Sequence, residues 1–415
     1  MLKKIPADQV TLGMYLQGFD GSWLAHPFWK TKFVLNDPAD LDSIRKSGVA
    51  YCLIDCNKGV DAKAPVSAMA EAIASSPAPV APAKPKRATV KPAVPKHVSM
   101  DEELGRAVQL AQRTRMAVVS MFTEARMGRA VDTDQCLPLV ADITSSVSRN
   151  PGALISLTRL KSKDDYTFMH SVAVCGLMVS LARQLNLDEA MTREAGLAGL
   201  LHDVGKMAMP AAVLNKPGAL TDVEFDIMRE HPRRGYEMLL NGKGVGEGPL
   251  DVCLHHHERM DGSGYPDRLK GDQLSLLARM GAVCDVYDAV TSARPYKEPW
   301  DPALSIQRMA QWKGHFDPGI FQAFVKGVGI YPIGTLVRLQ SGRLGVVVDQ
   351  AAGSLVTPQI KVFFSIKSQL PIPTEVVDLA HPSCKDRIVG REAPAEWGFT
   401  NLDDLWCPDR RKAAT

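Results

Sequence analysis

The sequence predicts a multi-domain, mainly α-helical protein with a small α+β module at its N-terminal end and a small β-rich unit at its C-terminal end. Two changes of pattern carry this prediction. Residues 58–97 alternate proline with alanine, valine and lysine, a composition that cannot bury enough apolar area to fold. The helical period that begins near Met100 gives way after Tyr331-Pro332 to short, alternating, β-branched runs. A chain of 415 residues has room for two or three such domains.

Residues 1–57 form the expected α+β module. Gly13 and Gly18 are expected at turns or bulges, and Trp23, Phe28 and Trp29 are expected to form the core, with a partner-binding aromatic patch as the alternative. Strands are expected over residues 10–19, 33–35 and 49–54, and a short helix over residues 40–46. Residues 58–97 should then form a semi-extended linker.

The next expected domain, residues 98–328, is all-helical. Apolar residues at helical spacing predict two amphipathic helices, one with Leu104, Val108, Ala111 and Met116, the other with Leu137, Val140, Ile143 and Val147. Further helices are expected over residues 168–185, 189–202, 222–240 and 274–291.

The expected C-terminal unit, residues 329–406, is a small barrel or sheet packed against the helical domain. Turns are expected at Ser341-Gly342 and Ala352-Gly353. The expected strands cover residues 335–339, 344–348, 360–364 and 375–379. Residues 407–415 should be a frayed basic tail.

Composition argues against several classes of protein. The net charge of +3 is too small to indicate a nucleic-acid binder. No apolar run approaches the roughly 20 residues that a membrane-spanning helix needs, and residues 1–6 do not lead into the apolar core of a signal peptide. The eight cysteines include no CxxC pair and suggest no disulfide framework. We therefore expect a cytoplasmic protein that binds neither nucleic acid nor membrane.

Histidine is concentrated in one part of the helical domain. Six of the ten histidines lie between His170 and His257, and several of them neighbour an acid. A lone histidine on an apolar helix is usually a core residue, but imidazole and carboxylate together suit divalent transition metals. This set could supply about five neutral nitrogen ligands beside Asp203 and Asp285, the mixture that a cluster bridged by carboxylate and water needs. The sequence therefore predicts a metal site.

The pair His202-Asp203 follows the apolar helical residues 195–201, so it is expected at the end of a buried helix. Adjacent helical residues point about 100° apart, so each side chain can reach a different metal, or the carboxylate can bridge two. A buried aspartate is costly unless it is paired or metal-bound. The alternative is an aspartate that only caps the turn before Gly205.

Basic residues lie near this pair and near Asp285. Lys206 is three residues after Asp203, and Arg294 and Lys297 follow Asp285 by nine and twelve residues. Metals with fixed cations suit a phosphoester, because the metals generate hydroxide and clamp phosphoryl oxygens while the cations offset charge. For Arg294 and Lys297 the alternative is an ordinary surface salt bridge.

Four blocks of residues, in this order, resemble the HD-GYP family, a branch of the HD-domain metal-dependent phosphohydrolases. They are Tyr166-Thr167 with His170-Ser171; Leu200-Leu201-His202-Asp203-Val204-Gly205-Lys206 with Pro210; His256-His257-Glu258-Arg259 with Asp261-Gly262-Ser263-Gly264-Tyr265-Pro266; and Asp285-Val286-Tyr287-Asp288-Ala289 with Arg294-Pro295-Tyr296-Lys297. They cover roughly residues 160–325. The N-terminal module resembles a small domain of unknown function that often precedes HD-GYP domains in bacteria.

The resemblance implies an HD-type helical bundle around a metal centre of iron or manganese, and hydrolysis of the bacterial second messenger cyclic di-GMP to the linear dinucleotide, with GMP as the product of a second cut. Asp203 would bridge the metals and, with Lys206, serve catalysis. Lys206, Arg294 and Lys297 would hold substrate phosphates, and the loop Gly264-Tyr265-Pro266 would lie near the mouth of the site. The implied metal ligands are His170, His202, Asp203, His231, His256, His257 and Asp285.

One departure from the family concerns the number of metals. Members of the three-metal type carry an acid four residues before the first ligating histidine, where this chain has Tyr166. Asp165 is one residue away, an error of about 100° on a helix. We therefore expect two divalent metals and no third. We also expect Glu258 to orient a ligating histidine rather than bind metal, and His255 to be no ligand.

Other functions remain open at this point. The domain could bind cyclic di-GMP without cleaving it and signal through partners, for which GGDEF-domain proteins are candidates. It could also act on another cyclic dinucleotide or on a nucleotide, since no guanine-binding residue is evident. A plain helical scaffold would require that no metal binds.

Overall fold

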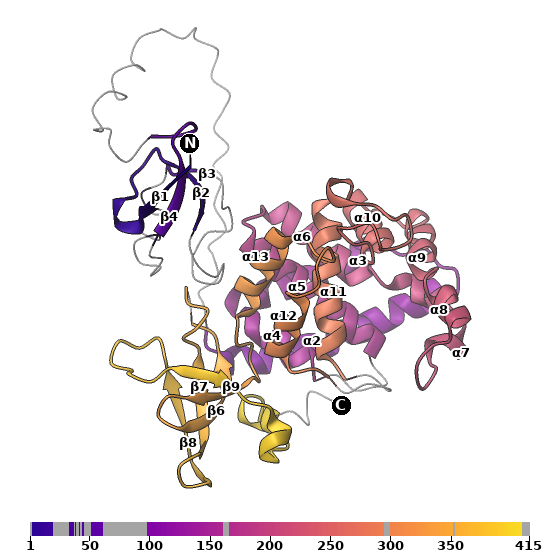
Figure 1. The fold of residues 1–415 in the computed structure, drawn as a ribbon. Helices are drawn as coiled ribbons and strands as arrows, with labels where there is room; N and C mark the ends of the chain where they lie inside the picture. The colour runs from indigo at the N-terminus through magenta and orange to yellow at the C-terminus, as the bar shows by residue number, and fades with distance from the viewer. Residues whose placement is uncertain are drawn as a thin grey trace, which may run out of the picture. The chain divides into compact units, whose positions relative to one another are not determined.

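The computed structural model describes residues 2–19, 33–36, 38, 41, 44, 51–60, 98–160, 166–293, 299–351 and 353–408. The chain divides into two compact units, residues 1–93 and 94–415. Helices dominate the second unit, and each unit contains a small sheet (Figure 1). The predicted class, multi-domain and mainly α with small sheets towards both ends, is confirmed.

The first unit contains a four-stranded antiparallel sheet of order β1-β4-β2-β3. Its strands are β1 (Leu2–Pro6), β2 (Tyr15–Phe19), β3 (Phe33–Val34) and β4 (Tyr51–Asp55). The strand expected over residues 10–19 begins only at Tyr15, because Gly13 has a φ of +88° and turns the chain before it. Gly18 lies where the pairing of β2 with β4 shifts register, which agrees with the turn or bulge expected at this residue.

The core predicted for the first unit cannot be compared with the described one. Trp23, Phe28 and Trp29 lie outside the described residues, as does most of the helix expected over residues 40–46. The described core consists of aliphatic and sulfur-containing side chains: Ile5, Ala7, Val10, Met14, Leu16, Leu35, Ile44, Cys52 and Ile54.

The second unit is built on helices α2 to α13. They are α2 (Met100–Arg126), α3 (Thr133–Arg149), α4 (Pro151–Thr158), α5 (Tyr166–Gln184), α6 (Glu189–Leu201), α7 (Ala211–Leu214), α8 (Asp222–Met228), α9 (His231–Leu240), α10 (Glu247–His255), α11 (Leu276–Thr291), α12 (Pro302–Met309) and α13 (Pro318–Val328). None of the described helices is long and apolar enough to cross a membrane.

One predicted helix is wrong. The segment 222–240 forms two helices, because α8 ends at Met228 and α9 begins anew at His231 with Pro232 in its first turn. Proline lacks the N–H that a helix interior needs but suits a first turn, where that N–H has no partner in any case. The break fixes the position of His231 at a helix start.

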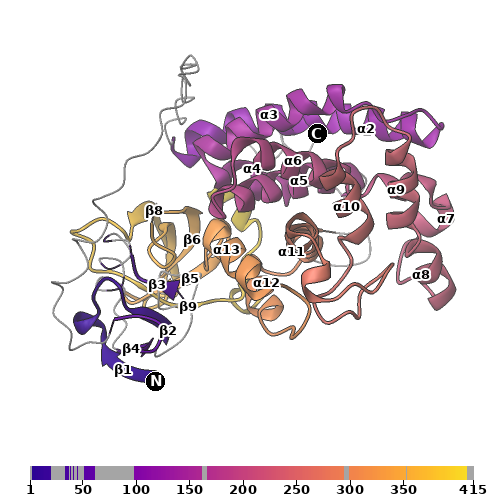
Figure 2. The same cartoon turned by 90° about the horizontal axis from the view of Figure 1, so that it is seen from above.

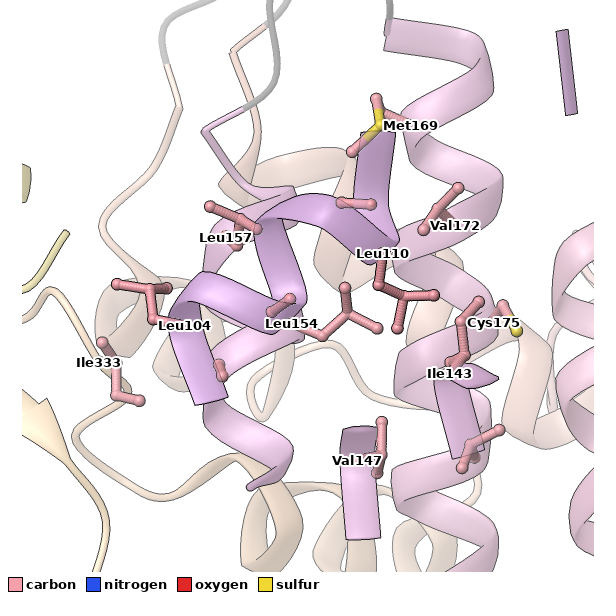
Figure 3. Close-up of a cluster of buried hydrophobic side chains, with 14 of the residues drawn as sticks. Leu104, Leu110, Ile143, Val147, Leu154, Leu157, Met169, Val172, Cys175 and Ile333 are labelled. Atoms are coloured by element: carbon pink, nitrogen blue, oxygen red, sulfur yellow. The ribbon is translucent and has the colours of Figure 1, made fainter. Parts of the chain in front are cut away.

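Helix α5 is the centre of the helical body, since its residues 169–182 are all buried. Around it pack α2, α3, α4, α6, α11 and α13. Figure 3 shows one part of this core, where Leu110 of α2, Ile143 of α3, Leu154 of α4 and Val172 of α5 converge. Burial of α5 on all sides gives a polar side chain on this helix a fixed, water-poor environment.

The sheet of the second unit is open, antiparallel and ordered β8-β7-β6-β5-β9. Its strands are β5 (Leu336–Leu339), β6 (Arg343–Asp349), β7 (Gln359–Ser365), β8 (Leu370–Asp378) and β9 (Ile388–Arg391). Its apolar side chains share a core with the helices, and both views place it beside α4 and α13 (Figures 1 and 2).

Two details of this sheet, and one of the residues that follow it, depart from prediction. Strand β9 was not expected. Strand β8 begins at Leu370, five residues earlier than expected, because Pro371 and Pro373 argue against a strand in the sequence. Both prolines are tolerated because β8 is an edge strand. Cys407, expected in a frayed tail, is fully buried beside Trp406.

Candidate metal centre

Helix α5 supplies the first residue of the site, His170, which is buried. Its Nδ1–H donates to Asp288 Oδ2 on α11 at 2.6 Å. Its Nε2 lies 2.9 Å from Asp285 Oδ1, one turn earlier on α11. The contact to Asp288 fixes the tautomer and turns Nε2 and its lone pair toward Asp285, as in the carboxylate–histidine–metal arrangement.

The end of α6 supplies the second and third residues. His202 is the C-cap of α6, and its Nδ1–H donates to the carbonyl of Gly199 at 2.8 Å. Asp203 precedes the short 3₁₀ helix η3 (Val204–Ala208) but makes no capping hydrogen bond to it. The capping alternative for Asp203 therefore finds no support in the geometry.

His231 and His256 repeat the pattern of His202. His231 Nδ1–H donates to the carbonyl of Met228 at 2.7 Å, and His256 Nδ1–H donates to the carbonyl of Val252 at 3.0 Å. Each histidine thereby directs Nε2 to the interior, and the two Nε2 atoms lie 3.4 Å apart. Two nitrogens bound to one metal at about 2.1 Å would be about 3 Å apart, so this separation fits a shared ion.

Asp203 lies between two sets of imidazoles. Its Oδ2 is 3.3 Å from His202 Nε2 and 3.5 Å from His170 Nε2. Its Oδ1 is 3.3 Å from His231 Nε2 and 3.7 Å from His256 Nε2. The two oxygens of one carboxylate thus face different histidine pairs, which is the geometry of a bridging ligand.

Ligand-type atoms of seven residues gather here. In three overlapping groups the candidate atoms lie within 4.8 Å of one another: His231 with His256 and His257, His170 with His202 and Asp285, and His202 with Asp203 and His256. The structure therefore brings together all seven residues that the sequence predicts as ligands. We call these seven residues the metal centre.

A close approach of backbones makes this convergence possible. A Cβ on Gly205 would lie 1.9 Å from the carbonyl oxygen of His231 and 2.4 Å from the backbone nitrogen of Gly235. Only glycine lets η3 contact the start of α9 so closely. The glycine of the His202–Lys206 block therefore places His231 beside Asp203.

The charge state of the site suits a cation. Burial alone would raise the pKa of Asp203, but Lys206 and His202 hold that pKa well below its usual range. The pKa of Asp285 is also held well below its usual range, against its burial, by His170 and His257. Burial lowers the pKa of His256 strongly and that of His257 to about 3. The pKa of His202 is instead raised, against its burial, by Asp203 and Asp285. Anionic carboxylates and neutral imidazoles are the forms that ligate metals, so a bound metal would displace a proton from His202.

Two buried atoms test whether a metal fits. His202 Nε2 and Asp203 Oδ1 have no hydrogen-bond partner within the described part of the chain. Buried polar atoms normally have partners, and leaving each unpaired costs about 1–3 kcal/mol. Since both atoms carry lone pairs and face the same interior, the residues present fit a bound cation.

Comparisons with known proteins agree with this geometry. The HD domain family matches residues 145–320, and a domain of unknown function, DUF3391, matches residues 2–136. A cyclic di-GMP phosphodiesterase of Pseudomonas aeruginosa is 55% identical over 407 residues, which are 98% of this chain and 96% of the relative. The chain belongs to the HD-GYP family. As an HD-domain phosphohydrolase it is a metal-dependent enzyme, and its N-terminal module is the predicted domain of unknown function.

Two further relatives match about half of this HD-GYP protein or less. A cyclic di-GMP phosphodiesterase response regulator of Xanthomonas campestris pv. campestris is 40% identical over 49% of this chain and 54% of its own. A 3'3'-cGAMP-specific phosphodiesterase of Vibrio cholerae is 38% identical over 35% of this chain and 28% of its own.

The loop that names the HD-GYP family forms one wall of the metal centre. The ring of Tyr265 stacks on His257 with centroids 4.8 Å apart, and Arg229 lies over the Tyr265 ring at 4.9 Å. Gly264 is buried and Pro266 half-buried, with a cis bond between Tyr265 and Pro266. The loop thus contacts a predicted ligand directly.

The predicted phosphate-binding residues divide into two groups. Lys206 Nζ donates to Asp203 Oδ2, so this cation lies directly at the metal centre. Arg294 and Lys297 lie outside the described residues. Tyr166, at the position of the third-metal acid, stacks its ring on His170 with centroids 5.4 Å apart.

The described contact of one residue differs from its predicted role, a second residue was missed, and a third lies apart from the ligands as expected. Glu258 accepts from the backbone nitrogen of Asp267 at 2.7 Å, so its described contact holds the loop and not a histidine. Asp288 orients His170 instead; its spacing of three residues from Asp285 on one helix was the available signal. His255 lies away from the metal centre, against Asp251 and Asp267.

Proposed function

We propose that this protein hydrolyses cyclic di-GMP to the linear dinucleotide at the metal centre, with GMP as the product of a second cut. The observation that carries the chemistry is the position of Asp203 between two histidine pairs. The substrate class is supported by the Pseudomonas aeruginosa relative, whose identity extends over nearly the whole chain.

Two divalent cations, iron or manganese, are the proposed cofactor. One would be held by His170, His202 and Asp285 with Asp203 Oδ2, the other by His231, His256 and His257 with Asp203 Oδ1. Bound there, such a pair lowers the pKa of a shared water and polarises phosphoryl oxygens. The ring of Tyr166 beside His170 supports two ions and not three, because it occupies the place of a third ion's carboxylate.

The chain's own residues would orient the reaction. Asp203, ionised despite burial, accepts a hydrogen bond from the attacking water and fixes its direction. The new P–O bond forms as the bond to the ribose 3' oxygen breaks opposite, and that oxygen takes up a proton. Lys206, beside Asp203, offsets charge on the phosphoryl oxygens. Arg294 and Lys297 are proposed to hold the phosphates of the substrate.

Supporting contacts keep these groups in place. Asp288 holds the His170 ring, and backbone carbonyls hold His202, His231 and His256. Fixed ligands reduce the reorganisation needed when charge develops in the transition state. The Tyr265 ring covers one face of His257 and limits access of water from that side.

The test is turnover by the metal-loaded protein. Wild type purified without oxygen and loaded with iron or manganese should cleave cyclic di-GMP, and His202→Ala/Asp203→Ala should lose both metal and turnover. His255→Ala is the matched control, because His255 adjoins His256 in sequence but its ring nitrogens bond Asp251 and Asp267, which are not part of the metal centre. Cleavage by the double variant at the wild-type rate would overturn the assignment of the site.

A second substrate is supported by one observation, the similarity to a 3'3'-cGAMP-specific phosphodiesterase of Vibrio cholerae. Rates for cyclic di-GMP and 3'3'-cGAMP, measured alone and in competition, separate the two possibilities. Binding of cyclic di-GMP without cleavage by fully metal-loaded protein would favour the adaptor alternative, with GGDEF-domain proteins as candidate partners. Action in the cytoplasm is part of the proposal and is supported by the eight cysteines, for which the structure shows no disulfide bond among the described residues.

A further inference from the structure

A second polar site lies within the second unit, between the helices and the sheet. A cavity of about 330 Å³ opens where α3, α4, α5 and α13 meet the end of β6. This volume is at the lower end of the range of small-molecule sites, about 300–1,000 Å³. Its lining includes Arg159, Arg183, Lys326, Tyr287, Asn150 and Asp349.

Three cations from three different segments line this cavity. Arg159 follows α4, Arg183 lies near the end of α5, and Lys326 lies in α13. Like charges gathered around one space raise its positive potential, because a partly buried site is screened less than the surface. We call this space the cationic cavity.

The two arginines keep donors without partners. Arg159 Nη2 donates to the carbonyl of Ile333, and Arg183 Nη2 donates to Glu189 at 3.3 Å. The Nε atoms of both arginines are buried and have no hydrogen-bond partner among the residues that the structure describes. An unpaired buried donor costs about 1–3 kcal/mol, so an anion close to these two guanidinium groups would be stabilised even without direct contact to Nε.

The carboxylate in the cavity wall does not supply that acceptor. Asp349 Oδ2 accepts from the backbone nitrogen of Met100 at 3.1 Å. Its Oδ1 accepts from Gln350 N at 2.8 Å and from Asn150 Nδ2 at 3.3 Å. This carboxylate therefore holds the start of α2 and the start of α4, and its printed hydrogen bonds go to none of the three cations.

We propose that the cationic cavity binds the phosphate group of a small phosphorylated molecule. Two guanidinium groups suit the several acceptor oxygens of a phosphate, and Lys326 adds a point charge. The volume admits a ligand of at most mononucleotide size.

This site is separate from the metal centre. Arg183 lies thirteen residues after His170 on the same helix, a distance of about 20 Å along its axis. The lining of the cationic cavity includes none of the seven residues of the metal centre. A ligand bound in the cavity would therefore not replace one bound at the metals.

Binding of inorganic phosphate and of GMP to the full-length, metal-loaded protein tests the proposal by calorimetry. We expect saturable binding that persists in His202→Ala/Asp203→Ala, weakens about tenfold or more in Arg183→Gln, and disappears in Ala351→Leu, which fills the cavity and keeps its cations. Arg113→Gln is the charge-matched control, because Arg113 lies on the exposed face of α2 and pairs with Asp142.

Three results would overturn the proposal. One is the absence of saturable binding that survives removal of His202 and Asp203. Another is equal affinity of wild type, Arg183→Gln and Ala351→Leu, each confirmed as folded by circular dichroism. The third is tighter binding of a simple carboxylate such as citrate than of either phosphate probe, which would make the ligand a carboxylate.

Discussion

The metal centre and the cationic cavity are two polar sites built on the same two helices with opposite sign. Helix α5 carries His170 at one end and Arg183 at the other, and α11 carries Asp285 for the first site and Tyr287 for the second. Among the residues that the structure describes, the buried atoms without partners carry lone pairs in the metal centre (His202 Nε2 and Asp203 Oδ1), whereas in the cavity they belong to groups that can donate, the two arginine Nε–H groups and the Tyr287 hydroxyl. The difference indicates which ligand each site takes: a cation in the first, an anion in the second.

A third buried polar cluster shows what a site without a ligand looks like. Glu103 is fully buried, and its carboxylate accepts from Arg149 Nε and Nη2, both at 2.7 Å, and from Ser146 Oγ at 2.8 Å. Both oxygens have partners inside the protein. We therefore expect this cluster to affect stability alone, whereas the other two affect binding.

The largest expected effect is on the metal centre. Asp203→Asn keeps the shape of the side chain but removes the charge that two imidazole pairs share. Turnover of cyclic di-GMP should fall more than a hundredfold, since even groups that only support a ligand change activity about 10–100-fold. Metal content by elemental analysis should fall in parallel. Full metal content with unchanged turnover in Asp203→Asn would contradict the proposal that Asp203 bridges the two metals.

The next effect concerns stability. Glu103→Gln should lower the free energy of unfolding by about 3 kcal/mol, because it leaves Arg149 without a charged partner. Arg149 and Ser146 outweigh burial and lower the pKa of Glu103, so the stabilisation is complete above the unfolded pKa and is lost as the pH falls through the folded pKa. Urea unfolding at neutral and acid pH measures this loss.

The control for this prediction is Glu102→Gln, one residue away on the exposed face of α2. It should change the unfolding free energy by about 0.5 kcal/mol or less. Equal effects of the two variants at neutral pH would show that the Glu103 cluster is no special source of stability.

A smaller effect is expected from the backbone contact that joins η3 to α9. Gly205→Ala should destabilise the protein by about 1–3 kcal/mol and reduce metal content, since the new Cβ pushes His231 away from Asp203. Gly105→Ala is its match, because a Cβ there meets no atom within 4 Å, and it should be neutral or stabilising by up to about 1 kcal/mol. Thermal unfolding and metal analysis of both variants test this prediction. Equal stability and equal metal content of Gly205→Ala and Gly105→Ala would contradict it.

The smallest effect concerns the support of a ligand. Asp288→Asn should weaken metal binding or turnover about 10–100-fold, because His170 loses the carboxylate that fixes its tautomer. Glu258→Gln, which keeps an acceptor for Asp267 N, should change metal affinity less. A larger loss of metal in Glu258→Gln would restore the role that the sequence predicts for Glu258.

The sequence predicts the metal centre better than its surroundings. The spacing of His202, Asp203 and Asp285 in apolar helices was sufficient to place them, because local pattern determines helices and their buried faces. Strand β1 was missed because Lys3, Lys4 and Pro6 do not look like a strand; pairing with β4, some fifty residues away, makes it one. The cationic cavity has no sequence signal, since Arg159, Arg183 and Lys326 meet only through tertiary packing.

The most direct measurement is anomalous X-ray diffraction from crystals of the manganese-loaded protein. The account predicts two peaks, each about 2.0–2.2 Å from a different oxygen of Asp203, with His170, His202 and Asp285 around one and His231, His256 and His257 around the other. A single peak, or two peaks that do not share Asp203, would contradict the bridging role at the centre of the account.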